Sequence, residues 1–162
     1  MKLAVRLAVP ALAVAALAGC SPAPSTAAVV DGVTITQVQA AEGAAACKET
    51  FPLVTESVAV QALVYRELVF KATQNLGTPL EEAKLNDIIK QNPDIAKLED
   101  GKCWTVVQGL FLLDELPVER TTPEAQEALR QIPFEVNPRY GSFDPTQGWD
   151  KVGGSLSVLS EK

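Results

Sequence analysis

The sequence is 162 residues long, carries a formal net charge of −6 and contains no histidine. The length corresponds to about one domain and is sufficient to bury a hydrophobic core. An acidic surface repels nucleic acid and anionic lipid head groups, so we expect neither as a partner. The lack of histidine excludes Ser-His-Asp and Cys-His catalysis and most zinc sites, which leaves carboxylates and lysines for chemistry. We predict no metal and no cofactor.

The first twenty residues have the pattern of an export signal. Lys2 and Arg6 give a positive start, and residues 7–18 form an apolar run too short to span a bilayer. Residues 17–20 are Leu, Ala, Gly and Cys, and they resemble a bacterial lipobox. The resemblance implies cleavage before Cys20 and attachment of lipid to its sulfur. The alternative is a signal peptide cleaved elsewhere, with Cys20 incidental.

We therefore predict a lipoprotein signal peptide at residues 1–19, a lipidated Cys20 with a flexible tether at 20–27, and one domain at 28–162. The tether is predicted from its small, polar and proline residues. Loss of the two signal-peptide cations changes the net charge from −6 to about −8. The lipid, rather than basic residues, would hold the protein at the extracytoplasmic face of the cell membrane.

The predicted domain begins with an extended segment and a helix. Residues 28–35 place β-branched residues on both sides of Asp31 and Gly32, a pair typical of tight turns. This pattern predicts a strand, a turn and a second extended piece. Thr36 and Gln39 then form a capping-box pattern, which predicts a helix running to Cys47.

A long helix and a shorter one are predicted next. Residues 51–76 carry apolar side chains on more than one helical face, which predicts a central helix with Pro52 in its first turn. Gly77 is expected to end it. Thr78 is the predicted N-cap of the following helix, which stops before Pro93.

Residues 103–116 are apolar nearly all round, which predicts a second buried helix with Trp104 and Phe111 in the core. Residues 121–124, which are Thr, Thr, Pro and Glu, are predicted to start a further short helix that ends near Gln131.

The pattern changes after this helix, because residues 132–138 alternate apolar and polar side chains and contain two prolines. Such a segment is typical of an edge strand. Residues 139–145 are rich in turn formers, and residues 156–159 are a possible last strand. The predicted fold is mainly α, with a small antiparallel β element joining the N- and C-terminal ends of the domain.

Cys47 and Cys103 remain after the predicted lipid site. An even pair of cysteines in an exported protein favours one disulfide. In the chain-entropy description, a loop of this length stabilises the fold by roughly 4 kcal/mol. The alternative is two buried free thiols.

Two stretches resemble the SurA N-terminal domain as found in actinobacterial lipoproteins. Residues 29–36 resemble its opening, where a strand runs through a turn into the first helix, and residues 136–144 resemble its closing strand. The resemblance extends over roughly residues 28–160. It implies a helical SurA N-terminal-like domain whose first and last strands pair, and a chaperone that binds unfolded exported polypeptides. Many members carry a parvulin-type prolyl isomerase domain, which this sequence lacks, so we predict no isomerase activity.

Four residues of the closing stretch are predicted to bind clients: Arg139, Tyr140, Phe143 and Trp149. Aromatic residues and arginine are favoured at interfaces, and Arg139 would position a backbone carbonyl of the client. The other interpretation is that the rings seal the end of the core while Arg139 pairs with a carboxylate.

The sequence favours a membrane-anchored SurA-like chaperone or assembly factor. The alternative is an interaction lipoprotein that docks on one folded cell-envelope partner. An enzyme is a third possibility, for which paired carboxylates such as Glu81 and Glu82 would need a cleft and shifted pKa values. A groove lined with apolar side chains would favour the chaperone, whereas one flat patch would favour the dedicated partner.

Overall fold

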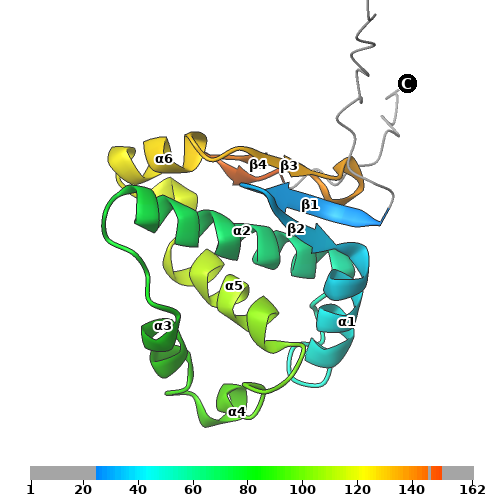
Figure 1. The fold of residues 1–162 in the computed structure, drawn as a ribbon. Helices are drawn as coiled ribbons and strands as arrows, with labels where there is room; N and C mark the ends of the chain where they lie inside the picture. Colours follow the sequence, from blue (N-terminus) through cyan, green and yellow to red (C-terminus); the bar gives the residue numbers. More distant parts are fainter. Residues whose placement is uncertain (1–24, 146, 151–162) are drawn as a thin grey trace, which may run out of the picture.

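A computed structural model describes residues 25–145 and 147–150 of the chain (Figure 1). The lipobox, the first part of the tether and the possible strand at 156–159 lie outside the described residues. The elements in chain order are β1 (Thr26–Val30), β2 (Val33–Thr36), α1 (Gln37–Cys47), α2 (Glu56–Asn75), α3 (Glu82–Ile89), α4 (Pro93–Ala96), α5 (Trp104–Glu115), η1 (Val118–Arg120), α6 (Pro123–Arg130), β3 (Phe134–Val136), η2 (Pro138–Tyr140), β4 (Phe143–Asp144) and β5 (Gly148–Trp149).

The main sheet joins the two ends of the described chain. Its strand order is β2-β1-β3, and both pairings are antiparallel, with Ala28 opposite Val136 in the second. Asp31 and Gly32 have φ values of 46° and 81°, as a type I′ hairpin turn requires. The predicted antiparallel element joining the domain ends is therefore confirmed. Strand β1 begins at Thr26, two residues before the predicted domain boundary, because pairing with β2 and β3 buries this part of the chain.

Helix α2 lies at the centre, between the sheet and α5 (Figure 1). It begins at Glu56 and not near Pro52, because the Thr55 hydroxyl accepts a hydrogen bond from the Val58 backbone N–H at 3.3 Å and fixes the first turn there. Most of its length is buried, as its apolar pattern predicted. Its buried residues are Ala59, Val60, Ala62, Leu63, Val64, Tyr65, Leu68, Val69 and Ala72.

Helix α5 occupies almost the range predicted for the second buried helix, and it crosses α2 closely. A Cβ at Gly109 would lie 2.0 Å from the Ala62 carbonyl oxygen, so only glycine permits this approach. A Cβ at Gly43 of α1 would lie 2.8 Å from Val106 Cγ2 of α5. Small residues thus set the spacing of the three helices.

The start of α3 differs from the prediction. The helix begins at Glu82, and its N-cap residue, Glu81, makes no side-chain capping hydrogen bond. The predicted cap, Thr78, donates its backbone N–H to the Thr73 carbonyl at 3.0 Å, and the Leu80 N–H is bound by the Thr73 hydroxyl at 3.1 Å. The end of α2 therefore holds this segment in a non-helical conformation. Helix α6 begins at Pro123, within the predicted residues 121–124, and the Thr122 hydroxyl accepts a hydrogen bond from the Ala125 backbone N–H at 3.3 Å.

The described chain is thus mainly helical, with a three-stranded sheet and a second sheet of two short strands, β4 and β5. Within residues 25–145 and 147–150, no helix combines the length and the apolar character that a membrane span requires.

Candidate functional site

The closing stretch, where client binding is predicted, packs most of its aromatic rings against the core. Arg139 on η2 is exposed, and its Nη1 donates to the Gln37 Oε1 at 3.3 Å. Its guanidinium carbon lies 5.0 Å from the centre of the Tyr140 ring. Tyr140 is only 4% exposed, and its hydroxyl donates to the Glu56 carboxylate. Burial, reinforced by this hydrogen bond, raises the pKa of Tyr140 to about 12.

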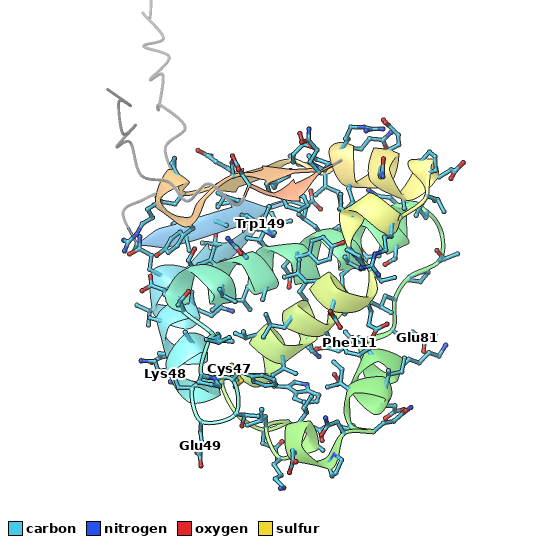
Figure 2. All side chains as sticks on the ribbon, turned by 180° about the vertical axis from the view of Figure 1, so that it is seen from behind. Cys47, Lys48, Glu49, Glu81, Phe111 and Trp149 are labelled. Atoms are coloured by element: carbon cyan, nitrogen blue, oxygen red, sulfur yellow. A yellow bond between two sulfur atoms is a disulfide. The ribbon has the colours of Figure 1, made fainter. Side chains whose placement is uncertain are left out.

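Phe143 and Trp149 also pack with the core. Phe143 is 8% exposed, and its ring centre lies 5.9 Å from that of Tyr65, 5.7 Å from that of Phe134 and 5.2 Å from that of Trp149. The Trp149 ring is half-buried, and its Nε1 has no hydrogen-bond partner among the described residues (Figure 2). A hollow of about 720 Å³ runs along β4 and β5, and Phe143 and Trp149 are part of its lining. Of the four predicted residues, Arg139 alone is exposed.

An apolar groove lies elsewhere, between α5 and the wall formed by α3, α4 and their connection. It encloses about 540 Å³, which is the size of many ligand sites. We call it the α5 groove. Its lining is Phe51, Ile88, Ile89, Gln91, Asn92, Ile95, Val107, Leu110, Phe111, Asp114 and Glu115.

The α5 groove explains the excess of apolar residues in α5. One side of this helix faces the core, where Val106 and Leu112 are fully or almost fully buried. Leu110 and Phe111 are only partly buried, and they line the groove instead. Figure 2 labels Phe111 on the side of α5 that faces α3. The core position predicted for Phe111 is therefore wrong in part, whereas Trp104 is buried as predicted.

A polar network fixes the α3 wall against α5. Gln108, which is fully buried, accepts from Arg66 Nε at 2.7 Å. Its Nε2 donates to Asn86 Oδ1 at 2.6 Å and to Glu82 Oε1 at 3.1 Å. The Gln108 hydrogen bond, with the nearby Arg66 charge, lowers the pKa of the Glu82 carboxyl. The Trp104 indole N–H also donates to Asn86, at 3.2 Å, so both helices share one set of hydrogen bonds.

The disulfide fixes the end of the groove where Phe51 lies. Cys47 and Cys103 are bonded, as predicted, which joins the end of α1 to the start of α5. Phe51 donates its backbone N–H to the Cys47 carbonyl at 2.7 Å. The aromatic ring that follows α1 is therefore positioned next to α5 by a covalent link and a backbone hydrogen bond.

Charge lies at one end of the α5 groove only. Asp114 and Glu115 are the charged residues of its lining, both exposed and both in the last turn of α5. Gln91 and Asn92 supply neutral polar groups at the α3–α4 connection. The remaining lining residues are apolar, so the site offers hydrophobic contact and negative charge.

Glu81 and Glu82, the paired carboxylates considered for catalysis, are both engaged in ion pairs, and so is Glu99. Glu81 Oε1 lies 2.8 Å from Lys84 Nζ, and Glu82 Oε1 lies 2.8 Å from Arg66 Nη2. Glu99 Oε1 lies 2.9 Å from Lys90 Nζ. In the described part of the chain, no three or more histidine, cysteine, aspartate or glutamate side chains are grouped as metal ligands.

Comparison of the chain with protein-family models, with curated proteins and with solved structures gives no match. The resemblance of residues 29–36 and 136–144 to the SurA N-terminal domain therefore stays a prediction from sequence.

The residues that line the α5 groove were not predicted from the sequence. The available signal was the apolar character of residues 103–116 on every helical face, which exceeds what packing against one neighbouring helix needs. Which of these side chains faces solvent depends on where α3 and α4 lie, and that placement comes from the long-range contacts of Gln108.

Proposed function

We propose that the protein is a SurA-like chaperone or assembly factor that binds unfolded exported polypeptides in the α5 groove. The observation that carries the proposal is the groove, in which partly exposed apolar side chains from separate elements line an open hollow. Ile88, for example, is 50% exposed. Apolar area removed from water contributes about 25 cal/mol per Å², and ordering of the bound segment offsets part of this gain. Binding should therefore be weak and broad.

Anchoring by lipid on Cys20, at the extracytoplasmic face of the cell membrane, belongs to the same proposal. The resemblance of residues 17–20 to a lipobox supports it. The disulfide between Cys47 and Cys103 is in keeping with an oxidising compartment outside the cytoplasm.

The test is a binding titration of the chain from Ser21 onward against peptides from unfolded exported proteins. The folded parent proteins serve as controls. We expect micromolar binding to many of the peptides and none to their folded parents. Binding to one folded envelope protein and to no peptide would replace the proposal with the docking lipoprotein.

A matched pair of variants locates the binding site. Ile88→Thr changes an exposed apolar residue of the groove, and Val38→Thr changes one on α1 that is 63% exposed and outside the groove lining. Loss of one buried CH₂ is worth about 0.8 kcal/mol, so Ile88→Thr should weaken peptide binding about fourfold or more. Val38→Thr should leave it unchanged. Equal effects of the two variants would place the binding site outside the α5 groove.

A further inference from the structure

In the part of the chain that the structure describes, the acidic residues of the α5 groove form no ion pair, whereas the lysines near its opposite wall are paired. Asp114 and Glu115 form no ion pair with any described residue. Lys90 and Lys97, the lysines nearest in sequence to the opposite wall, are each already paired with a carboxylate. Arg120 lines a neighbouring hollow with Glu115, and among the described residues the two form no ion pair. Within the described part of the chain, the Asp114 and Glu115 carboxylates at this end of the groove are therefore not engaged in an ion pair.

The backbone of α5 adds to this negative charge. The C-terminal end of a helix carries a partial negative charge, so acidic residues in the last turn are unfavourable to the helix. Asp114 and Glu115 occupy that position, and the last turn of α5 contains no basic residue. Both side chains are exposed at the groove, where a cationic group from outside could approach them. A positive ligand would relieve the repulsion that the helix alone leaves in place.

We infer that the α5 groove selects unfolded segments in which an apolar run is flanked by lysine or arginine. The inference rests on the proposed function, because it assumes that the groove binds unfolded chains. The apolar side chains of such a segment contact Ile88, Leu110 and Phe111, and its cation lies beside Asp114 and Glu115. Apolar contact supplies the affinity, and the carboxylates set which flanking residues are preferred.

The experiment compares peptides that share one central apolar run and differ only in their flanking residues, which are lysine, glutamine or glutamate. The full chain is held in lipid nanodiscs, with empty nanodiscs as the blank. Exposed ion pairs contribute modestly, so we expect the lysine peptide to bind about threefold to tenfold tighter than the glutamine peptide at low salt. The glutamate peptide should bind most weakly. The preference should shrink at about 0.5 M salt, because salt screens exposed charges.

A matched pair of double variants distinguishes an effect of the groove carboxylates from an effect of the net charge of the protein. Asp114→Asn with Glu115→Gln removes the groove carboxylates. Glu49→Gln with Glu135→Gln removes the same charge at exposed positions outside the groove lining, and Figure 2 shows Glu49 projecting away from Phe111. We expect the first variant to lose the preference for lysine while still binding the glutamine peptide. The second variant should keep the preference.

The binding results distinguish failure of the charge preference from failure of the proposed function. Equal binding of the three peptides to the unmodified chain would overturn the inference and leave the proposed function intact. Equal loss of preference in both double variants would also overturn it, because net charge would then be the cause. If no peptide binds, including the glutamine peptide, the proposed function itself fails.

Discussion

Two glycines set how closely the helices approach, and they differ in what a methyl group would meet. At Gly109 the obstacle is the backbone carbonyl of Ala62, at 2.0 Å, which cannot move without moving α2. At Gly43 the obstacle is the Cγ2 methyl of Val106, at 2.8 Å, and this belongs to a side chain. Replacement of glycine by alanine favours a helix by about 1 kcal/mol. Each substitution therefore combines a gain in helix propensity with a steric clash of the added methyl group.

Gly109→Ala should destabilise the protein by about 3 kcal/mol or more, because α2 and α5 must separate and the packing between them is lost. Gly43→Ala should stay within about 1 kcal/mol of the unmodified protein, since small shifts at Val106 offset part of the clash. Denaturant unfolding measures both. Equal stability of the two variants would show that the α2–α5 approach is wider than described.

Tyr140 predicts a loss of stability at high pH. The unfolded chain deprotonates tyrosine near pH 10, whereas the folded protein holds this proton until its pKa of about 12. The stability that results from the raised pKa of Tyr140 is therefore fully present below pH 10, and it falls by about 2 kcal/mol between pH 10 and 12. Tyr140→Phe lacks this titration, so its free energy of unfolding should converge on that of the unmodified protein across this interval. Parallel curves for the two proteins would contradict the assignment.

At the scale of elements, the sequence predicts an element correctly where the residues that determine it are neighbours in the chain. The turn at Asp31 and Gly32, the Thr36 cap and the start of α6 within residues 121–124 all depend on neighbouring residues, and the structure confirms them. The start of α3 depends instead on hydrogen bonds to Thr73, so the pattern at Thr78 was misleading. Tertiary contacts override a capping pattern when they bind the same backbone groups.

The candidate site was less predictable than the fold. Aromatic residues in the closing stretch look the same in sequence whether they bind a client or cover a core, and in the structure Tyr140 and Phe143 are buried. The α5 groove draws its lining from segments far apart in sequence, including Phe51, Ile88 and Phe111. No short sequence pattern spans them.

The disulfide stabilises the fold and also holds the end of α1 next to the α5 groove. Replacing Cys47 and Cys103 by alanine should lower the free energy of unfolding by roughly 4 kcal/mol, because the unfolded chain regains the entropy of the open loop. Peptide binding should weaken as well, since Phe51 follows the end of α1 that the bond holds. Reductant should act on the unmodified protein and not on the double variant. Unchanged unfolding of the reduced protein would contradict a stabilising bond.

At the scale of the whole molecule, the sheet and the groove lie on opposite sides. In Figure 1, α2 and α5 separate the main sheet from α3 and α4. The predicted tether leads into β1, which belongs to that sheet. On the anchored protein that we propose, the chain therefore enters the domain on the side remote from the α5 groove, which leaves the groove accessible to polypeptides.

The anchor itself is tested by Cys20→Ser. Without the sulfur no lipid can be attached, so the variant should move from the membrane fraction to the soluble exported fraction. Ser25→Ala, in the predicted tether, should remain membrane-bound. Fractionation followed by immunoblotting measures the distribution. A Cys20→Ser variant that stays with the membrane would show that another feature holds the protein there.

The pairing of β1 with β3 has a consequence for the order of folding during synthesis. Ala28 is made long before Val136, its partner across the strands, so more than a hundred residues must be added before the pair can form. At ribosomal rates of 5–20 residues per second, this delay is roughly 5–20 s. During that time β1 has one unpaired edge, which is open to pairing with another chain. The nascent domain is thus itself an incompletely folded polypeptide until β3 arrives.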